Sequence, residues 1–234
     1  MNLRKTVILD SLDFAAQESE ERRLRLLIAV LGLLGMFAVG RRLAGGEVLI
    51  GSVFWETLAV LAVGICGVLA AAAFTRRANK AHRLLPPWFG VMVLVFELLI
   101  PTGAMVVQIV SPQIDGFSAL GAPVVLTFGV LILLSILRLR VWMCVLAGVL
   151  SGALHLGAYG FTVRSEGGFG PLGAPFYVSY AAILVVVGLA AALVTKEVRG
   201  YVRRALLEAE TEAKLEALRH DLDIAKRIQE GLFP

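Results

Sequence analysis

The chain has 234 residues, of which 58% are hydrophobic and 17% are charged, and its formal net charge is +4. Soluble domains average about 45–50% apolar and about 25% charged residues, so this composition excludes a typical soluble enzyme, a disordered chain and a disulfide-rich secreted module. The two cysteines, Cys66 and Cys144, lie inside apolar runs and indicate neither a disulfide framework nor a metal site. The sequence therefore predicts an integral membrane protein.

Six apolar stretches are long enough to cross a bilayer as helices, which takes about 20 residues each. Helices satisfy their own backbone hydrogen bonds in lipid, so we expect an all-α membrane protein with a six-helix transmembrane bundle. This bundle, residues 24–195, is the expected sensor domain. Its predicted spans cover approximately residues 24–40, 48–74, 84–110, 120–137, 141–161 and 176–195.

The positions of the basic residues predict the orientation of these spans. With both termini in the cytoplasm, all but three of the 22 Lys and Arg residues fall on the cytoplasmic side, the exceptions being Arg41, Arg42 and Arg164. We therefore expect a multi-pass protein of the bacterial inner (cytoplasmic) membrane, with the lipid bilayer and no nucleic acid as a partner. Residues 1–23 form a cytoplasmic segment that is either an amphipathic helix on the membrane surface or a loose tail.

Ionisable residues at bilayer depth are costly, and three of them lie in the predicted spans: Glu56, Glu97 and His155. Helical spacing places Gln108 on the same face as Glu97, and Tyr159 on the same face as His155. One interpretation is an interior pocket in which these side chains bind a ligand or a proton. The alternative is that they are buried hydrogen-bonding residues that hold the helices together.

Three residues of the same spans favour close or bent helix packing. Gly148 and Gly152 form a small-xxx-small pair, which lets two membrane helices approach closely. Pro101 frees the carbonyl of Glu97, four residues earlier, and we expect a kink there.

After residue 195 the composition changes to charged residues and strong helix formers. Apolar residues recur there at heptad-like spacing, so residues 196–234 are expected to continue the last span as a cytoplasmic signalling helix in a parallel, two-chain coiled coil. The alternative is a solvated, monomeric helix. The residues expected to carry dimerisation and signal transmission are Leu215, Leu218, Leu222, Ala225, Ile228, Gln229, Leu232 and Pro234.

Residues 221–234 resemble the linker helix that precedes the catalytic domain in bacterial metal-dependent Ser/Thr phosphatases of the stage II sporulation E type, relatives of protein phosphatase 2C. In that family the linker typically ends in acidic-Leu-x-x-Ala-Arg/Lys-x-Ile/Val-Gln-x-x-Leu-x-Pro. Phe233 departs from the pattern, because an aliphatic residue is commoner at its position. The matching residues are Leu222, Ala225, Lys226, Ile228, Gln229, Leu232 and Pro234.

The resemblance implies a regulatory role. In such phosphatases the linker contributes to dimerisation and helps to set whether the catalytic domain binds its Mn²⁺/Mg²⁺ pair and acts on a phosphoprotein. The aspartate ligands of that domain are not among these residues, so we expect no cofactor and no phosphatase activity in this chain. It is expected to be the sensor-and-transmitter half of a longer, homodimeric protein. The alternatives are the membrane region of a nucleotide cyclase or histidine kinase, a small transporter or channel, and an anchor without a ligand.

Overall fold

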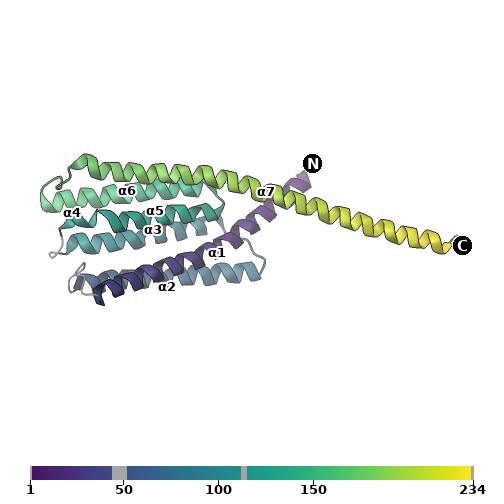
Figure 1. The fold of residues 1–234 in the computed structure, drawn as a ribbon, viewed down its shortest axis with the longest axis horizontal. Coiled ribbons are helices and arrows are strands. Elements are labelled where there is room, and N and C mark those ends of the chain that lie inside the picture. Colours follow the sequence, from purple (N-terminus) through teal and green to yellow (C-terminus); the bar gives the residue numbers. More distant parts are fainter. Residues whose placement is uncertain (1, 44–51, 112–114, 233–234) are drawn as a thin grey trace. The chain divides into compact units, whose positions relative to one another are not determined.

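The computed structural model describes residues 2–43, 52–111 and 115–232, and every regular element in these ranges is a helix (Figure 1). The all-helical class expected from the sequence is confirmed. In chain order the elements are α1 (Asn2–Leu43), α2 (Ser52–Lys80), α3 (Pro87–Val110), α4 (Gly116–Ala119), α5 (Ala122–Leu134), the 3₁₀ helix η1 (Ser135–Arg138), α6 (Val141–Glu166) and α7 (Ala174–Leu232).

Four of the described helices, α2, α3, α6 and α7, are long and apolar enough to cross a membrane. The other two expected spans fall on α1 and on α5 with η1. With 13 residues, α5 is about 20 Å long, which is less than the roughly 30 Å of a hydrocarbon core. The structure thus supports a membrane protein with four candidate spans, and the number six stays a prediction.

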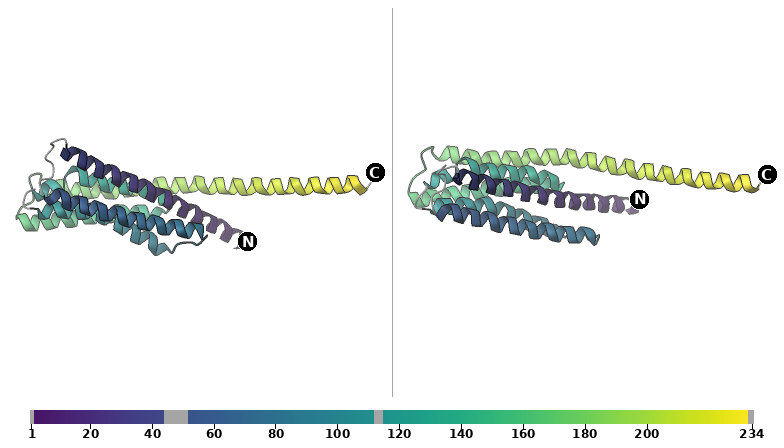
Figure 2. Two further views of the ribbon diagram at one scale, coloured as in Figure 1. Left: turned by 90° about the horizontal axis from the view of Figure 1, so that it is seen from below. Right: turned by 60° about the horizontal axis from the view of Figure 1, so that its bottom comes forward.

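The contacts divide the chain into two units, residues 1–196 and 197–234, which are described separately. In the first unit α1 packs on α2, α2 on α3, and α3 on both α5 and α6. Figures 1 and 2 show these helices running alongside one another. Their shared core is apolar and includes Leu27, Leu94, Leu98, Phe128 and Ile132.

Helix α1 continues through residue 23, where the sequence suggested a boundary between a tail and the first span. Its buried apolar residues Leu24, Leu27 and Leu31 recur at helical spacing and face the bundle. Arg23 lies on the same side of the helix and is completely buried. The chain around residue 23 is therefore part of the packed bundle.

Helix α7 is 59 residues long and contributes to both units. In the first unit its buried residues Tyr177, Ala181, Leu184 and Ala191 follow the spacing of one helix face. In the second unit the side chains of residues 211–230 are all exposed.

Candidate functional site

A buried carboxylate in the middle of α3 is the centre of the candidate site. Glu97 is 1% exposed and accepts hydrogen bonds from two arginines. Arg23 Nη1 donates to Glu97 Oε2 at 2.9 Å, and Arg23 Nη2 donates to Glu97 Oε1 at 2.5 Å. Arg138 Nη2 donates to Glu97 Oε2 at 3.0 Å. Glu97 thus joins α1 to the end of η1 through α3.

A second carboxylate completes this group. Glu20, one turn before Arg23 on α1, accepts from Arg23 Nε at 2.9 Å and from Arg23 Nη2 at 2.7 Å. Its Oε1 also lies 3.6 Å from Arg138 Nη2. We call Glu20, Arg23, Glu97 and Arg138 the charge cluster. It has two positive and two negative side chains, so it is neutral as a whole.

Burial makes the charge cluster energetically sensitive. The side chains of Arg23 and Arg138 are 0% and 2% exposed, and that of Glu20 is 14% exposed. Desolvating several charges is expensive, and their mutual attraction offsets the cost only when the geometry is good. Removing one partner of a buried pair costs about 3–5 kcal/mol, because the other charge stays buried and unpaired. The position of α1 against α3 and η1 is therefore tied to this cluster.

Polar contacts beside the charge cluster hold the same part of α1 in place. Gln17 Nε2 donates to Asn79 Oδ1 at 2.7 Å and to the carbonyl of Arg83 at 2.9 Å. The backbone N–H of Leu85 donates to Gln17 Oε1 at 2.9 Å. Ser19 Oγ donates to the carbonyl of Leu137 at 2.6 Å. These bonds connect α1 with the end of α2, with the segment between α2 and α3, and with η1.

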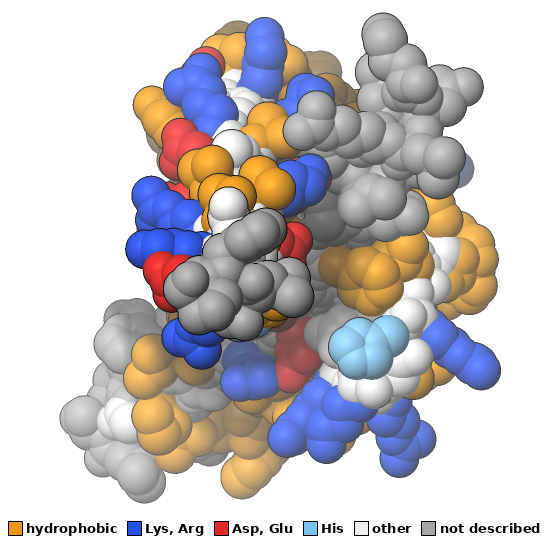
Figure 3. Space-filling view, turned by 90° about the vertical axis from the view of Figure 1, so that its right-hand side faces the viewer, with side chains coloured by type: hydrophobic (Ala, Val, Ile, Leu, Met, Phe, Trp, Pro, Cys, Tyr) orange, Lys and Arg blue, Asp and Glu red, His pale blue; other side chains and the backbone are white. Residues whose placement is uncertain are grey.

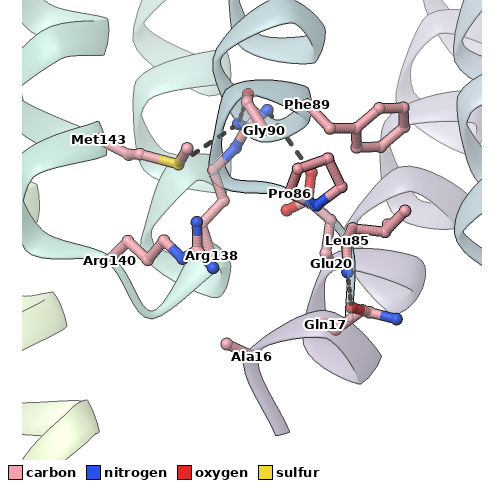
Figure 4. A pocket seen from close by; sticks show the side chains of 10 residues that line it. All are labelled: Ala16, Gln17, Glu20, Leu85, Pro86, Phe89, Gly90, Arg138, Arg140 and Met143. Atoms are coloured by element: carbon pink, nitrogen blue, oxygen red, sulfur yellow. Dashed lines mark hydrogen bonds and ion pairs between the residues drawn. The ribbon is translucent and has the colours of Figure 1, made fainter. Parts of the chain in front are cut away.

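The backbone between η1 and α6 has an unusual conformation. Leu139 has a φ of 54°, in the left-handed region, which costs a residue with a side chain about 1–2 kcal/mol. It stands between Arg138 and Arg140, which both line a cavity next to the charge cluster (Figure 4). Arg138 Nη1 also donates to the carbonyl of Gly90 at 2.5 Å, so the turn is fastened to the start of α3.

Two glutamates on α1 have shifted pKa values. Burial opposes the ionisation of Glu20, but the positive charges of Arg23, Arg138 and Arg140 outweigh it and hold the pKa of Glu20 below its ordinary value. The hydrogen bond from Arg25 lowers the pKa of Glu21, against the effect of burial and with further help from Asn79. Both groups are thus stabilised as carboxylates.

The structure does not gather the sensing candidates into one pocket. Glu97 belongs to the charge cluster, whereas Glu56 is exposed on α2. His155 and Tyr159 are buried on α6, where the Tyr159 hydroxyl donates to the carbonyl of Phe169 at 3.3 Å. Gln108 is partly exposed two residues before the end of α3.

His155 is fully buried, and its ring stands edge-on to Tyr180 of α7 with 6.1 Å between centroids. Within the described part of the chain, both ring nitrogens lack a hydrogen-bond partner, as does the buried hydroxyl of Ser151 one turn earlier. His155 is therefore a packed residue whose polar atoms are unsatisfied.

The glycine pair does bring two helices together. A Cβ atom added to Gly148 would lie 2.8 Å from the Cα of Gly188, and one added to Gly152 would lie 3.0 Å from the carbonyl oxygen of Ala181. Gly148 and Gly152 thus face the backbone of α7. Pro101 is buried inside α3, which continues past it to Val110.

The residues expected to carry dimerisation lie in the second unit. Leu215, Leu218, Leu222 and Ile228 are 51%, 59%, 69% and 57% exposed. Ala225 and Gln229 are exposed too. Leu232 is the last residue of α7, and its side chain and Pro234 fall outside the described part of the chain.

The sequence interpretation missed Arg23 and Arg138, since both stand at the edges of apolar stretches and were assigned to the cytoplasm. The signal that would have identified them is Glu97 itself. A carboxylate in the middle of a span needs a cationic partner, and arginines at the ends of neighbouring spans reach inward with long side chains.

Comparison of the chain with protein-family models, with curated proteins and with solved structures gives no match in any of the three.

Proposed function

We propose that this chain is the membrane sensor and signal-transmitting region of a bacterial metal-dependent Ser/Thr protein phosphatase. In this proposal both ends face the cytoplasm of an inner-membrane protein with six spans. The bundle has two arrangements, and a stimulus that favours one of them shifts the linker helix and thereby the output domain.

The observation that carries the proposal is the composition of α7 along its length. The helix begins with an apolar stretch that can cross a membrane and continues as a charged helix to Leu232. The charged part has exposed leucines at heptad-like spacing, among them Leu215, Leu218 and Leu222. An isolated helix gains little stability in water, and fully burying a leucine contributes roughly 1.5–3 kcal/mol. A second copy of the chain would cover these leucines in a parallel coiled coil.

The choice of a phosphatase as the output rests on the resemblance of residues 221–234 to the family's linker. The Mn²⁺/Mg²⁺ pair and the contacts with a phosphoprotein substrate would belong to a catalytic domain outside these residues.

The charge cluster takes part in the proposed signalling as well. It fixes α1 on the bundle, so a change in its pairing would alter the packing of the helices that precede α7.

A helical-phase experiment tests this function. Residues 1–234 are fused to a catalytic domain of the phosphatase family, and alanines are inserted one at a time after Glu208. Each inserted residue turns the seam by about 100°, whereas seven residues make two coiled-coil turns and restore its register. We expect the phosphatase rate to change with one or two insertions and to recover with seven. A rate that no insertion alters would contradict transmission through this helix.

A further inference from the structure

The end of α2 and the segment that follows it carry a concentrated positive charge. Arg76, Arg77, Lys80 and Arg83 stand close together in the sequence, and all four are exposed. The sequence has no acidic residue from position 57 to position 96, so neither α2 after its first turns nor the start of α3 supplies a carboxylate to balance them.

Only the first of these cations acts on a carboxylate, that of Glu21 on α1, which the charge of Arg76 stabilises. Within the described ranges, no hydrogen bond or ion pair engages the side chains of Arg77, Lys80 and Arg83. The dipole at a helix C-terminus is equivalent to only about half a negative charge. More positive charge than the molecule itself balances is therefore left at this surface.

The backbone at the end of α2 does not need these side chains as caps. The N–H of Arg83 donates to the carbonyl of Ala78 at 3.0 Å, and the N–H of His82 donates to the carbonyl of Asn79 at 3.1 Å. His82 has a φ of 49°, in the left-handed region, as this type of helix ending requires. Because backbone amides satisfy these last carbonyls, the basic side chains are left for another partner.

An exposed apolar face of α2 leads up to the basic residues. Phe74, Ala70 and Cys66 precede Arg77 by three, seven and eleven residues, so they lie on the same side of the helix, and all are exposed. Only 11% of the most apolar part of α2 is buried, against 33–44% in the other three candidate spans. Eleven residues of helix cover about 16 Å, close to the hydrocarbon thickness of one leaflet. The face thus has the length of an acyl chain and ends at cations.

Aromatic side chains stand at the level of these cations. Trp88, at the start of α3, is 59% exposed and lies edge-on to Phe89, whose ring centroid is 5.1 Å from that of Phe74. Tryptophan is enriched where membrane meets water, because its ring is apolar and its N–H is polar. Figure 3 looks onto the end of the molecule at which α2 finishes and shows Lys and Arg side chains gathered beside hydrophobic ones.

We propose that the end of α2 binds an anionic phospholipid, with its phosphate held by Arg77 and Lys80 and an acyl chain along the exposed face of α2. Clusters of basic residues next to a membrane span attract anionic headgroups. A lipid matches both the unbalanced cations and the apolar face, whereas a soluble anion would use only the cations. A second copy related by a two-fold axis along the membrane normal would bring the two basic ends together, and like charges repel.

The proposal rests on α2 as a membrane span and not on the phosphatase output, so the test measures binding alone. The purified full chain in neutral detergent is titrated with phosphatidylglycerol or with phosphatidylcholine of identical acyl chains, and the lipid retained is counted by native mass spectrometry. Each cation near a membrane surface contributes about a fivefold factor in binding. We expect phosphatidylglycerol to be retained more tightly by at least that factor, and equal retention of the two lipids would overturn the proposal.

Matched variants assign the preference to the end of α2. Arg77→Gln and Lys80→Gln should each weaken the retention of phosphatidylglycerol about fivefold, whereas Lys80→Arg should bind like the wild type. Arg164→Gln makes the same charge change at an exposed position near the end of α6 and should also bind like the wild type. A lipid preference that both glutamine variants leave unchanged would overturn the proposal.

The native cysteine of α2 tests the rival occupant, a second copy of the chain. Cys66 is exposed on the face in question, whereas Cys144 is buried. With a lipid on this face, a mild oxidant should leave the chain without disulfide-linked dimers in native membranes. Rapid formation of a disulfide between the Cys66 residues of two copies would show that a second copy covers the face and would contradict the lipid site.

Discussion

Arg23 and Glu97 are 74 residues apart in the chain and form a bidentate, fully buried ion pair between α1 and α3. Arg138 joins the same carboxylate from η1. Three elements therefore meet at one glutamate, and the arrangement of α1 on the bundle depends on that residue. Bidentate pairs of this kind are specific in geometry as well as strong.

The first prediction concerns Glu97. Replacing it by glutamine leaves Arg23 and Arg138 buried with an uncompensated charge, which should lower the free energy of unfolding by about 3–5 kcal/mol. Thermal unfolding in detergent measures the effect. Glu56→Gln is the matched control, because Glu56 is exposed on a neighbouring helix and should change the midpoint little. Equal midpoints for the two variants would show that the charge cluster does not hold the bundle.

The second prediction concerns the contact between α6 and α7. Gly148→Ala places a methyl group 2.8 Å from the Cα of Gly188, so the helices must separate, at a cost of about 1–3 kcal/mol. Gly157 lies on the same helix, and no described atom outside its own stretch of helix backbone comes within 4 Å of a Cβ added there. Gly157→Ala should therefore be neutral or stabilise the helix by up to about 1 kcal/mol. The idea of a glycine-mediated contact fails if both variants have the same stability.

The third prediction distinguishes packing from sensing at His155. Both ring nitrogens are buried and have no partner among the residues that the structure describes, and leaving such an atom unsatisfied costs about 1–3 kcal/mol. His155→Leu should therefore keep or raise the thermal midpoint, and it should leave the activity of the phosphatase fusion unchanged. If His155 binds a ligand or proton, the variant will instead abolish a response of the fusion while the protein stays folded.

The fourth prediction concerns acid stability. The folded-state pKa of Glu21 is lowered, chiefly by the hydrogen bond from Arg25. A carboxyl group with a depressed pKa stabilises the fold above its unfolded-state value and loses this effect as the pH falls through its folded-state value. The thermal midpoint should thus decline below the ordinary value of 4.5, and Glu21→Gln should make the decline shallower.

Glu18→Gln is the control for that experiment. It removes an ion pair with Arg22 whose side chains are 66% and 73% exposed, and exposed pairs contribute little. Its pH profile should follow that of the wild type. A steeper or unchanged decline in Glu21→Gln would contradict the assignment.

The sequence predicted the helices better than it predicted the site. Runs of apolar residues predict the helical class and the approximate positions of α2, α3, α6 and the apolar part of α7. Such runs indicate a helix however the helices of a bundle are arranged. The sequence also predicted the close helix contact at Gly148 and Gly152 of α6, because small residues at this spacing let membrane helices approach each other closely.

The partners of Glu97 were not predictable by the same method. Hydropathy averages over a window, so a single arginine at the edge of a span, such as Arg23 or Arg138, is counted with the polar flank. Its actual depth depends on how the helices cross and on where its long side chain reaches, which are tertiary properties. For the same reason the sequence could not tell that Glu56 faces outward while Glu97 faces inward.

If α7 transmits signals as one of two parallel helices, as proposed, cysteine cross-linking will detect the pair directly. In a protein that carries Cys66→Ser, a single cysteine replaces Leu215, Leu218 or Leu222, or His220 as a control. Cross-linking of each variant is measured in native membranes. Cys144 is retained because it is buried. Two residues turn a helix by about 200°, so His220 lies on the face opposite Leu222.

We expect disulfide-linked dimers to form rapidly at the three leucine positions, with little cross-linking at position 220. No dimer at any position, or equal cross-linking on both faces, would contradict it.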